Sequence, residues 1–259
     1  MKHQRVKALS MLDVSEIFGP TVQGEGKRVG RPSIFIRLAR CNLSCSGFAV
    51  QYVDDKGQKK LGCDTYYAVD PCFKSQWKKQ TSTDIIEQVS ALCGDSKYDI
   101  VISGGEPLLF WKKADFQALL AHFYKQKQQV TIETNASIAI QFTENYQQHV
   151  LFSMSVKLAN ANEPVQKRIN PQAIKNIVDN STDCYFKFVV NKQEAQSCLT
   201  QIKQITAAAA HIDVYLMPLG DTVQALANND QAVVDLCTKH NYIYCDRTHV
   251  RIWSDKRGV

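Results

Sequence analysis

The chain has 259 residues, 44% of them hydrophobic, which is enough to bury a full core as one large domain or two small ones. It contains no run of about 18 apolar residues, so the sequence predicts no membrane-spanning helix, and its basic N-terminal stretch is too polar for a signal peptide. The net charge of +6 is dispersed, which favours a solvated surface over a nucleic-acid interface. We therefore expect a cytoplasmic protein whose nine cysteines serve as ligands, catalytic thiols or core residues rather than in disulfides.

Short apolar segments alternate with amphipathic ones along the chain, beginning with SIFIRLA at residues 33–39. The apolar segments are typical of buried strands, and the amphipathic ones, such as residues 82–94 with a Ser/Thr/Asp start and a Gly stop, are typical of helices. The other predicted strands are 98–107, which runs into a glycine turn, 129–135, 149–158, 184–190, 212–220 and an extended tail at 241–253; the other predicted helices are 113–126, 191–205 and 228–240.

This alternation, repeated about six times, is typical of a parallel α/β sheet. A complete eight-stranded barrel takes about 250 residues, and much of the N-terminal part of this chain carries motifs instead. We therefore predict a partial (β/α) barrel, an incomplete TIM-like barrel, in a single domain over residues 1–259. In such folds the site forms at the carboxyl ends of the strands, where Cys41, Gly104–Pro107, Thr134–Asn135 and Lys157 would meet.

Three cysteines stand in the stretch RCNLSCSGFAVQYVDDKGQKKLGCDT, at Cys41, Cys45 and Cys63. Three thiolates can hold a 4Fe–4S cluster and leave one iron open to a ligand. The same residues could form a zinc site with Cys72 as the fourth ligand, or could be ordinary core cysteines. The cysteines alone leave these three interpretations open.

The sequence ISGGEP, at Ile102–Pro107, follows directly on a predicted buried strand. Its two glycines allow the backbone to approach a ligand closely, and Glu106 could accept a hydrogen bond from an ammonium group. By itself the segment is also typical of a turn that ends a strand. Beside a thiol-rich loop, it indicates an amino-acid group bound next to a metal centre.

Several motifs together resemble the 7-carboxy-7-deazaguanine synthases, a family of radical S-adenosylmethionine enzymes. They are EIFGPTVQGEGKRVGRPSIFIRLARCNLSC from Glu16, CDT from Cys63, SGGEP, SVKLA, FKFVV and the C-terminal RTHVRIWSDKRGV, so the resemblance covers nearly the whole chain. The chain departs from the family pattern after the second cysteine. In the family, only two residues separate the second cysteine from the third. That spacing would put the third cysteine at position 48, where this chain has Phe48.

Residues 46–62 therefore resemble an insertion within the cluster-binding loop. Strand-forming residues flank the turn DDKG inside it, as in a β-hairpin. Because a hairpin brings its ends together, we predict that Cys63 returns beside Cys45. The cost of loop closure grows slowly with length, which permits such an insertion. Gly62 is a second departure, because the family often has an aromatic residue before the third cysteine.

The resemblance implies conversion of 6-carboxy-5,6,7,8-tetrahydropterin to 7-carboxy-7-deazaguanine with loss of ammonia. It implies a 4Fe–4S cluster, S-adenosyl-L-methionine and Mg²⁺ as cofactors. A flavodoxin or ferredoxin would supply the electron, and the family is often homodimeric. The implied residues are Cys41, Cys45 and Cys63 for the cluster, Thr65 for Mg²⁺, Gly104, Gly105, Glu106, Ser155 and Lys157 for S-adenosylmethionine, and Gln23, Glu25, Arg37 and His249 for the pterin.

Each substrate residue also has an ordinary structural explanation. Glu25 could be a loop carboxylate, Arg37 the polar face of a strand, and His249 a packed residue beside Trp253 in the tail strand. As a set in the order and spacing of the family, they favour the functional interpretation. Three other functions stay open: a radical enzyme that activates a protein substrate, a non-catalytic zinc-dependent nucleic-acid-binding module, and a relative without its cluster. The cysteines assigned to the core are Cys93, Cys184, Cys198, Cys237 and Cys245.

Overall fold

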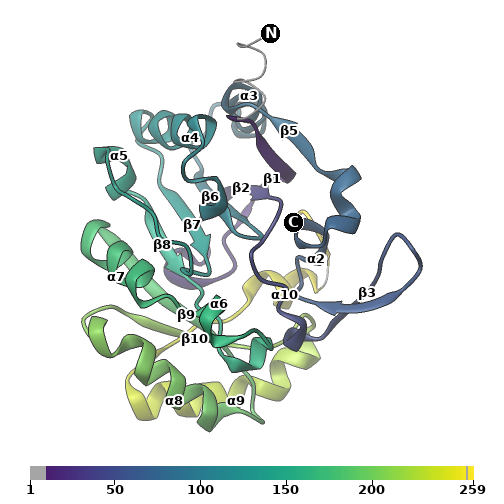
Figure 1. Ribbon diagram of the computed structural model, residues 1–259, viewed down its shortest axis with the longest axis vertical. Helices are drawn as coiled ribbons and strands as arrows, with labels where there is room; N and C mark the ends of the chain where they lie inside the picture. The colour runs from purple at the N-terminus through teal and green to yellow at the C-terminus, as the bar shows by residue number, and fades with distance from the viewer. Residues whose placement is uncertain (1–9, 255) are drawn as a thin grey trace.

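A nine-stranded, mostly parallel open sheet is the frame of the protein in the computed structural model, which describes residues 10–254 and 256–259 (Figure 1). Its strand order is β11-β10-β9-β8-β7-β6-β2-β1-β5. Neighbouring strands from β2 to β11 run parallel, which confirms the predicted α/β class. The strands are β1 (Leu12–Val22), β2 (Pro32–Leu38), β5 (Lys78–Gln80), β6 (Asp99–Gly104), β7 (Val130–Thr134), β8 (Leu151–Met154), β9 (Asp183–Val190), β10 (Val214–Pro218) and β11 (Ile243–Tyr244).

Two strands at one edge were not predicted. β1 pairs antiparallel with β2, and β5 pairs antiparallel with β1. The register between β1 and β2 is irregular between Phe18 and Thr21, around Gly19 and Pro20. Such residues interrupt the alternation by which a strand is read from sequence. Tertiary pairing with β2 therefore decides the conformation of this segment.

The helices form an outer layer around the sheet, with α4, α7, α8 and α9 in an arc (Figure 1). Local signals define several ends: Thr81 and Asp84 form a capping box at α3, and Thr222 caps α9, which begins before the predicted 228. α7 was missed, although Asn170 caps it and Pro171 occupies its first turn. The longer helices are α3 (Ser82–Cys93), α4 (Ala114–Lys125), α7 (Pro171–Asn180), α8 (Ala195–Thr206) and α9 (Val223–His240), and the shorter ones are α2 (Tyr66–Val69), α5 (Asn145–Gln148), α6 (Val165–Arg168) and α10 (Thr248–Trp253).

The prediction of an extended tail over residues 241–253 is wrong beyond β11. Residues Thr248–Trp253 form α10, and the Thr248 amide donates to the Gly24 carbonyl at 3.0 Å. His249 and Trp253 therefore lie on a helix rather than on a strand. In a segment of only six residues, the apolar and polar positions fit the periodicity of a helix as well as that of a strand. Contact with the loop after β1 therefore decides which of the two forms.

The predicted hairpin is present as β3 (Val50–Val53) and β4 (Lys59–Gly62), which pair antiparallel and extend away from the main sheet (Figure 1). Its turn is closed by Asp54, whose side chain accepts from the amides of Lys56 and Gln58. At its base Tyr52 stacks on Tyr66 with ring centroids 4.3 Å apart. A Cβ on Gly62 would lie 3.1 Å from the Tyr52 ring, so the aromatic group expected before Cys63 comes instead from across the hairpin.

The core lies between the sheet and its helices and includes three of the five cysteines that were assigned to it, Cys184, Cys198 and Cys237, with Cys93 partly buried against it. Cys245 is buried outside this cluster, where its sulfur accepts a hydrogen bond from the Gly26 amide at 3.0 Å. Among the described residues, no helix is long and apolar enough to cross a membrane.

Candidate functional site

One cavity of about 760 Å³ opens at the carboxyl ends of the parallel strands. Every site residue predicted above lines it, with the exception of Glu106. The topology thus brings to one cavity predicted site residues that are as far apart in the sequence as Gln23 and His249. The predicted residues that line the cavity are Gln23, Glu25, Arg37, Cys41, Cys45, Cys63, Thr65, Gly104, Gly105, Ser155, Lys157 and His249.

The three loop cysteines lie together on one side of this cavity. Cys45 is buried against Ala161, and Cys41 and Cys63 pack against the same small cluster. Burial raises the pKa of all three thiols, that of Cys45 to about 12. Within residues 10–254 and 256–259, no three or more His, Cys, Asp and Glu side chains are arranged to hold a single metal ion. Because their pKa values are raised, the three thiols would release protons on binding a metal centre, which takes the thiolate form.

Glu163, which sequence reasoning missed, anchors the loop that carries Cys41 and Cys45. One of its carboxylate oxygens accepts from the Ser44 amide at 2.5 Å, from the Ser44 hydroxyl at 2.7 Å and from the Cys45 amide at 2.9 Å. The same loop packs closely against Asn160, because a Cβ on Gly47 would lie 2.1 Å from the Asn160 carbonyl oxygen. The segment after β8 therefore holds the loop through contacts within the protein.

The glycines of ISGGEP are required by protein packing. A Cβ on Gly104 would lie 1.9 Å from the Leu38 carbonyl oxygen, and one on Gly105 would lie 2.1 Å from that of Arg40. The end of β6 therefore packs directly against the segment that leads to Cys41. Both glycines also line the cavity, so their backbone still faces a ligand.

Glu106 is fully buried below the cavity wall. Its carboxylate accepts from the Leu108 amide at 2.9 Å, the Thr134 hydroxyl at 2.7 Å and the Asn135 amide at 2.6 Å. Burial raises the pKa of this carboxyl group, although these donors act in the opposite direction. Glu106 thus ties the end of β6 to the end of β7 and does not reach the cavity.

Replacing Glu106 by alanine is expected to lower the free energy of unfolding by about 2–4 kcal/mol, because it leaves buried donors without an acceptor. The measurement is urea unfolding of the apoprotein. The control is Glu87→Ala on α3, where the side chain is exposed; its effect should stay within about 0.5 kcal/mol. Equal effects would show that the donors at Glu106 find other acceptors.

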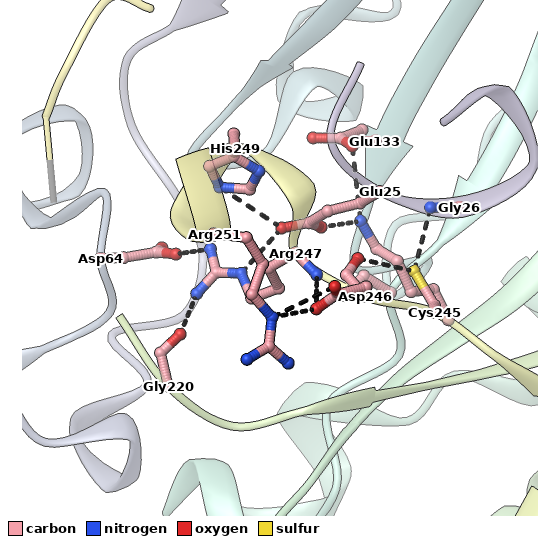
Figure 2. A network of polar contacts seen from close by, with 12 residues as sticks. Glu25, Gly26, Asp64, Glu133, Gly220, Cys245, Asp246, Arg247, His249 and Arg251 are labelled. Carbon is pink, nitrogen blue, oxygen red and sulfur yellow. Dashed lines mark hydrogen bonds and ion pairs between the residues drawn. The ribbon is translucent and has the colours of Figure 1, made fainter. Parts of the chain in front are cut away.

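Another part of the cavity wall is a network of charges centred on the buried Glu25 (Figure 2). Lys187 donates to one Glu25 oxygen at 2.6 Å, and Arg247 donates to the other at 2.9 Å. Lys187 also lies 3.4 Å from Glu133, which accepts from the Ser103 hydroxyl at 2.7 Å. Burial by itself would raise the pKa of Glu25, but Lys187 and Arg247 hold it well below its ordinary value. Glu25 is therefore ionised.

Arg37 and Gln23 place further hydrogen-bond donors beside the network around Glu25. Arg37 donates through Nε to Glu16 at 2.6 Å, and its guanidinium lies 5.6 Å from the ring centroid of Phe18. Gln23 is buried, and its amide nitrogen lies 3.5 Å from Glu133. The Arg37 side chain faces the cavity, so it is more than the polar face of a strand.

Ser155, Lys157 and Thr65 lie nearer to the cysteines. The Lys157 ammonium group donates to the Ser155 hydroxyl at 2.9 Å and lies 5.7 Å from the ring centroid of Phe48. The Thr65 hydroxyl lies 3.4 Å from the sulfur of Cys63. These hydroxyl and ammonium groups provide hydrogen-bonding capacity beside the thiols.

His249 lies against Gly24, where a Cβ would approach its Nδ1 to 2.1 Å. Its Nε2 is 3.8 Å from Glu25. Burial lowers the pKa of His249; Glu25, Asp64 and Glu133 oppose this, whereas Arg247 adds to it. His249 is therefore neutral in the folded protein at neutral pH.

This lowered pKa predicts a loss of stability on acidification. Below pH 6.5, the ordinary pKa of histidine, the unfolded chain takes up a proton at His249 that the folded protein resists, so folding weakens as the pH falls. His249→Gln should lose less unfolding free energy than the wild type between about pH 7.5 and 5.5. Urea unfolding at both pH values measures this, and equal losses would contradict it.

Some functional candidates were visible in the sequence only weakly. Lys187 stands inside an apolar strand, and a buried lysine is rare without a partner. Glu133 likewise lies in the predicted strand 129–135. Asp64 and Arg247 stand in the motifs CDT and RTHVRIWSDKRGV, but no local pattern assigns them a role, because their contact joins residues 183 positions apart.

Comparison with known proteins gives consistent findings. A family model described as "4Fe-4S single cluster domain" matches residues 22–178. The chain is 29% identical to the 7-carboxy-7-deazaguanine synthase of Halobacterium salinarum, over 94% of this chain and 91% of the relative. It is 28% identical to the enzyme of that name from Rhodopirellula baltica, over 96% and 90% of the two chains.

A solved structure shares the fold. QueE from Escherichia coli superimposes with a TM-score of 0.67 at 19% identity, over 96% of this chain and 99% of that one. The prediction of a partial barrel with a β-hairpin in the cluster loop is thereby confirmed.

Proposed function

The chain belongs to the 4Fe–4S single cluster domain family and to the radical S-adenosylmethionine 7-carboxy-7-deazaguanine synthases, and from this premise we propose how its cavity acts. Its activity is the formation of 7-carboxy-7-deazaguanine in queuosine precursor biosynthesis. We propose that the substrate is 6-carboxy-5,6,7,8-tetrahydropterin and that ammonia is released. The observation that carries the proposal is that three thiols and a buried Glu25–Lys187–Arg247 network face one cavity.

The donor set on the thiol side fits a 4Fe–4S cluster. Cys41, Cys45 and Cys63 open onto the cavity, and no fourth cysteine lines it in the part of the chain that the structure describes. Three thiolates leave one iron for S-adenosylmethionine. When bound, the cluster and S-adenosylmethionine supply the radical that removes a hydrogen atom from the substrate.

The chain's own residues hold these groups in place. We assign Ser155, Lys157 and the backbone of Gly104 and Gly105 to S-adenosylmethionine, because they line the cavity near the thiols. The Thr65 hydroxyl is assigned to Mg²⁺, which prefers oxygen ligands and keeps several waters. Glu106 is a positioning residue in this proposal, since its carboxylate is already occupied.

The network side fits the pterin. An ionised Glu25 accepts hydrogen bonds from the amino and ring N–H groups of a pterin edge, and Gln23 and neutral His249 add further contacts. Arg37 uses Nε for Glu16, and its terminal nitrogens offer a charged donor to the substrate carboxylate. The buried network keeps water away from these charges and fixes their orientation.

The test is an anaerobic assay of reconstituted protein with dithionite, Mg²⁺, S-adenosylmethionine and 6-carboxytetrahydropterin. Mass spectrometry should detect 7-carboxy-7-deazaguanine. Cleavage of S-adenosylmethionine without this product would overturn the pterin assignment and favour a protein substrate. Absence of an iron–sulfur cluster after reconstitution would overturn the radical chemistry altogether.

Partners and organisation follow from the same proposal. The cluster needs one electron from outside, and a flavodoxin or ferredoxin is the proposed donor. We also propose a cytoplasmic homodimer in which residues 1–259 form one domain with residues 46–62 inserted in the cluster loop. A homodimer would give twice the chain mass of 29.2 kDa in light scattering.

A further inference from the structure

Asp64 stands between Cys63 and Thr65, at the point where the chain returns from the hairpin. Its carboxylate accepts a hydrogen bond from Arg247 Nη2 at 2.5 Å. Arg247 comes from the segment just before α10, 183 positions away in sequence. The segment that carries one thiol and one hydroxyl of the site is thus held from the far end of the chain.

The Arg247 guanidinium binds three groups at once (Figure 2). Besides Asp64, it donates through Nε to Glu25 at 2.9 Å and through Nη1 to the Gly220 carbonyl at 2.6 Å. Its side chain is 12% exposed, so water contributes little to its solvation. Glu25 is 12% exposed and Asp64 is 43% exposed, and the cation between them offsets the repulsion of their two carboxylates.

Only arginine suits this arrangement. Its planar guanidinium presents donors along different edges in a fixed geometry, whereas lysine offers a single point charge. Arg251, on α10, provides the contrast: it pairs with Asp230 and Asp246 and does not line the cavity. The two arginines have similar chemistry but different neighbours.

We propose that Arg247 is a positioning residue that fixes the Cys63–Thr65 segment relative to Glu25, and so couples the hairpin-bearing cluster loop to the pterin site. This inference rests on the proposed function of the cavity. The hairpin separates Cys45 from Cys63 by 17 residues, and the stacking of Tyr52 on Tyr66 holds the returning segment on one side. Arg247 holds the same segment at Asp64.

The first experiment measures the Asp64 link without substrate. Urea unfolding of the apoprotein is compared for the wild type, Arg247→Gln, Asp64→Asn and the double variant. We expect the two substitutions to be non-additive by about fivefold or more in the unfolding equilibrium constant, as residues in direct contact are. Additivity would overturn the link, whatever reaction the protein catalyses.

The second experiment measures the coupling to the pterin. Arg247→Gln should raise the KM for 6-carboxytetrahydropterin about tenfold, while iron content and the KM for S-adenosylmethionine stay within about twofold. Arg247→Lys should recover little, because one ammonium group cannot hold both carboxylates in the same geometry. Arg251→Gln, the matched control, should leave all three quantities within about twofold.

A pterin KM that is unchanged in Arg247→Gln would overturn the proposal, and so would an equal rise of this KM in Arg251→Gln. Loss of cluster in Arg247→Gln with recovery in Arg247→Lys would also overturn it, since charge alone would then suffice. A wild-type protein that makes no product refutes the proposed function instead, and the unfolding measurements still decide whether Arg247 holds Asp64.

Discussion

Replacing Cys63 by alanine is expected to reduce the iron and sulfide of the reconstituted protein from one cluster per chain to background. Only three cysteines line the cavity within the described residues, so Cys63→Ala leaves two thiolates for the cluster. Two ligands do not hold a cluster that is normally bound by three or four. Iron and sulfide analysis, together with the visible absorption spectrum, measures the loss.

The matched control is Cys72→Ala, which should keep the full cluster. Cys72 lies in the turn after α2, where its amide donates to Asp70 at 3.0 Å, and it does not line the cavity. Half or more of the wild-type iron in Cys63→Ala would contradict the assignment of the third ligand. Loss of the cluster in Cys72→Ala would show that Cys72 is a cluster ligand. The position to which the hairpin returns Cys63 would then not matter for cluster binding.

Cys63 reaches its place because the inserted segment folds back on itself. β3 and β4 pair from Val50 with Gly62 to Val53 with Lys59, so the two ends of the insertion lie side by side. Ordering this segment costs conformational entropy, which the strand pairing and the Tyr52–Tyr66 stack offset. A 17-residue insertion is therefore compatible with a compact thiol site.

Replacing Lys187 by methionine is expected to lower the free energy of unfolding by about 3–5 kcal/mol. The Lys187 side chain is 4% exposed and lies between Glu25 and Glu133. Burial by itself would lower the pKa of Lys187, but the two carboxylates raise it well above its ordinary value. The substitution removes the cation between two largely buried carboxylates and leaves Arg247 as the remaining arginine or lysine partner of Glu25, and urea unfolding measures the cost.

Lys27→Met is the control for this prediction. Lys27 also pairs with a carboxylate, that of Asp183 at 2.7 Å, but both side chains are well exposed. Exposed pairs contribute about 0–1 kcal/mol, so this variant should change stability little. An effect of Lys187→Met as small as that of Lys27→Met would show that water solvates Glu25 and Glu133 once the lysine is gone.

The same residues of this protein contribute to its stability and to its proposed substrate site. The Glu25 carboxylate that is assigned to the pterin is also the centre of the buried ion pairs with Lys187 and Arg247. Its charge is therefore set by folding, before substrate arrives. A site organised in this way needs little rearrangement when a ligand binds.

The sequence by itself determined the α/β class, most strands, four of the five longer helices, and the hairpin. These features depend on neighbours in the chain: the apolar runs at β2 and β6, the capping box at Thr81, and the DDKG turn. It also placed the thiols and the glycines at strand ends, where a parallel sheet brings them together. The resemblance of its motifs to one family added the roles of the site residues.

Only the tertiary structure decided the rest. Residues 248–253 become a helix because they pack on the loop after β1, and Glu106 turns inward because Thr134 and Asn135 offer donors there. Pairs such as Lys187 with Glu25 and Arg247 with Asp64 join residues 162 and 183 positions apart. No local pattern encodes such partners, because these contacts form only when the folded sheet brings distant segments to the same cavity, where a charge with little access to water needs a partner.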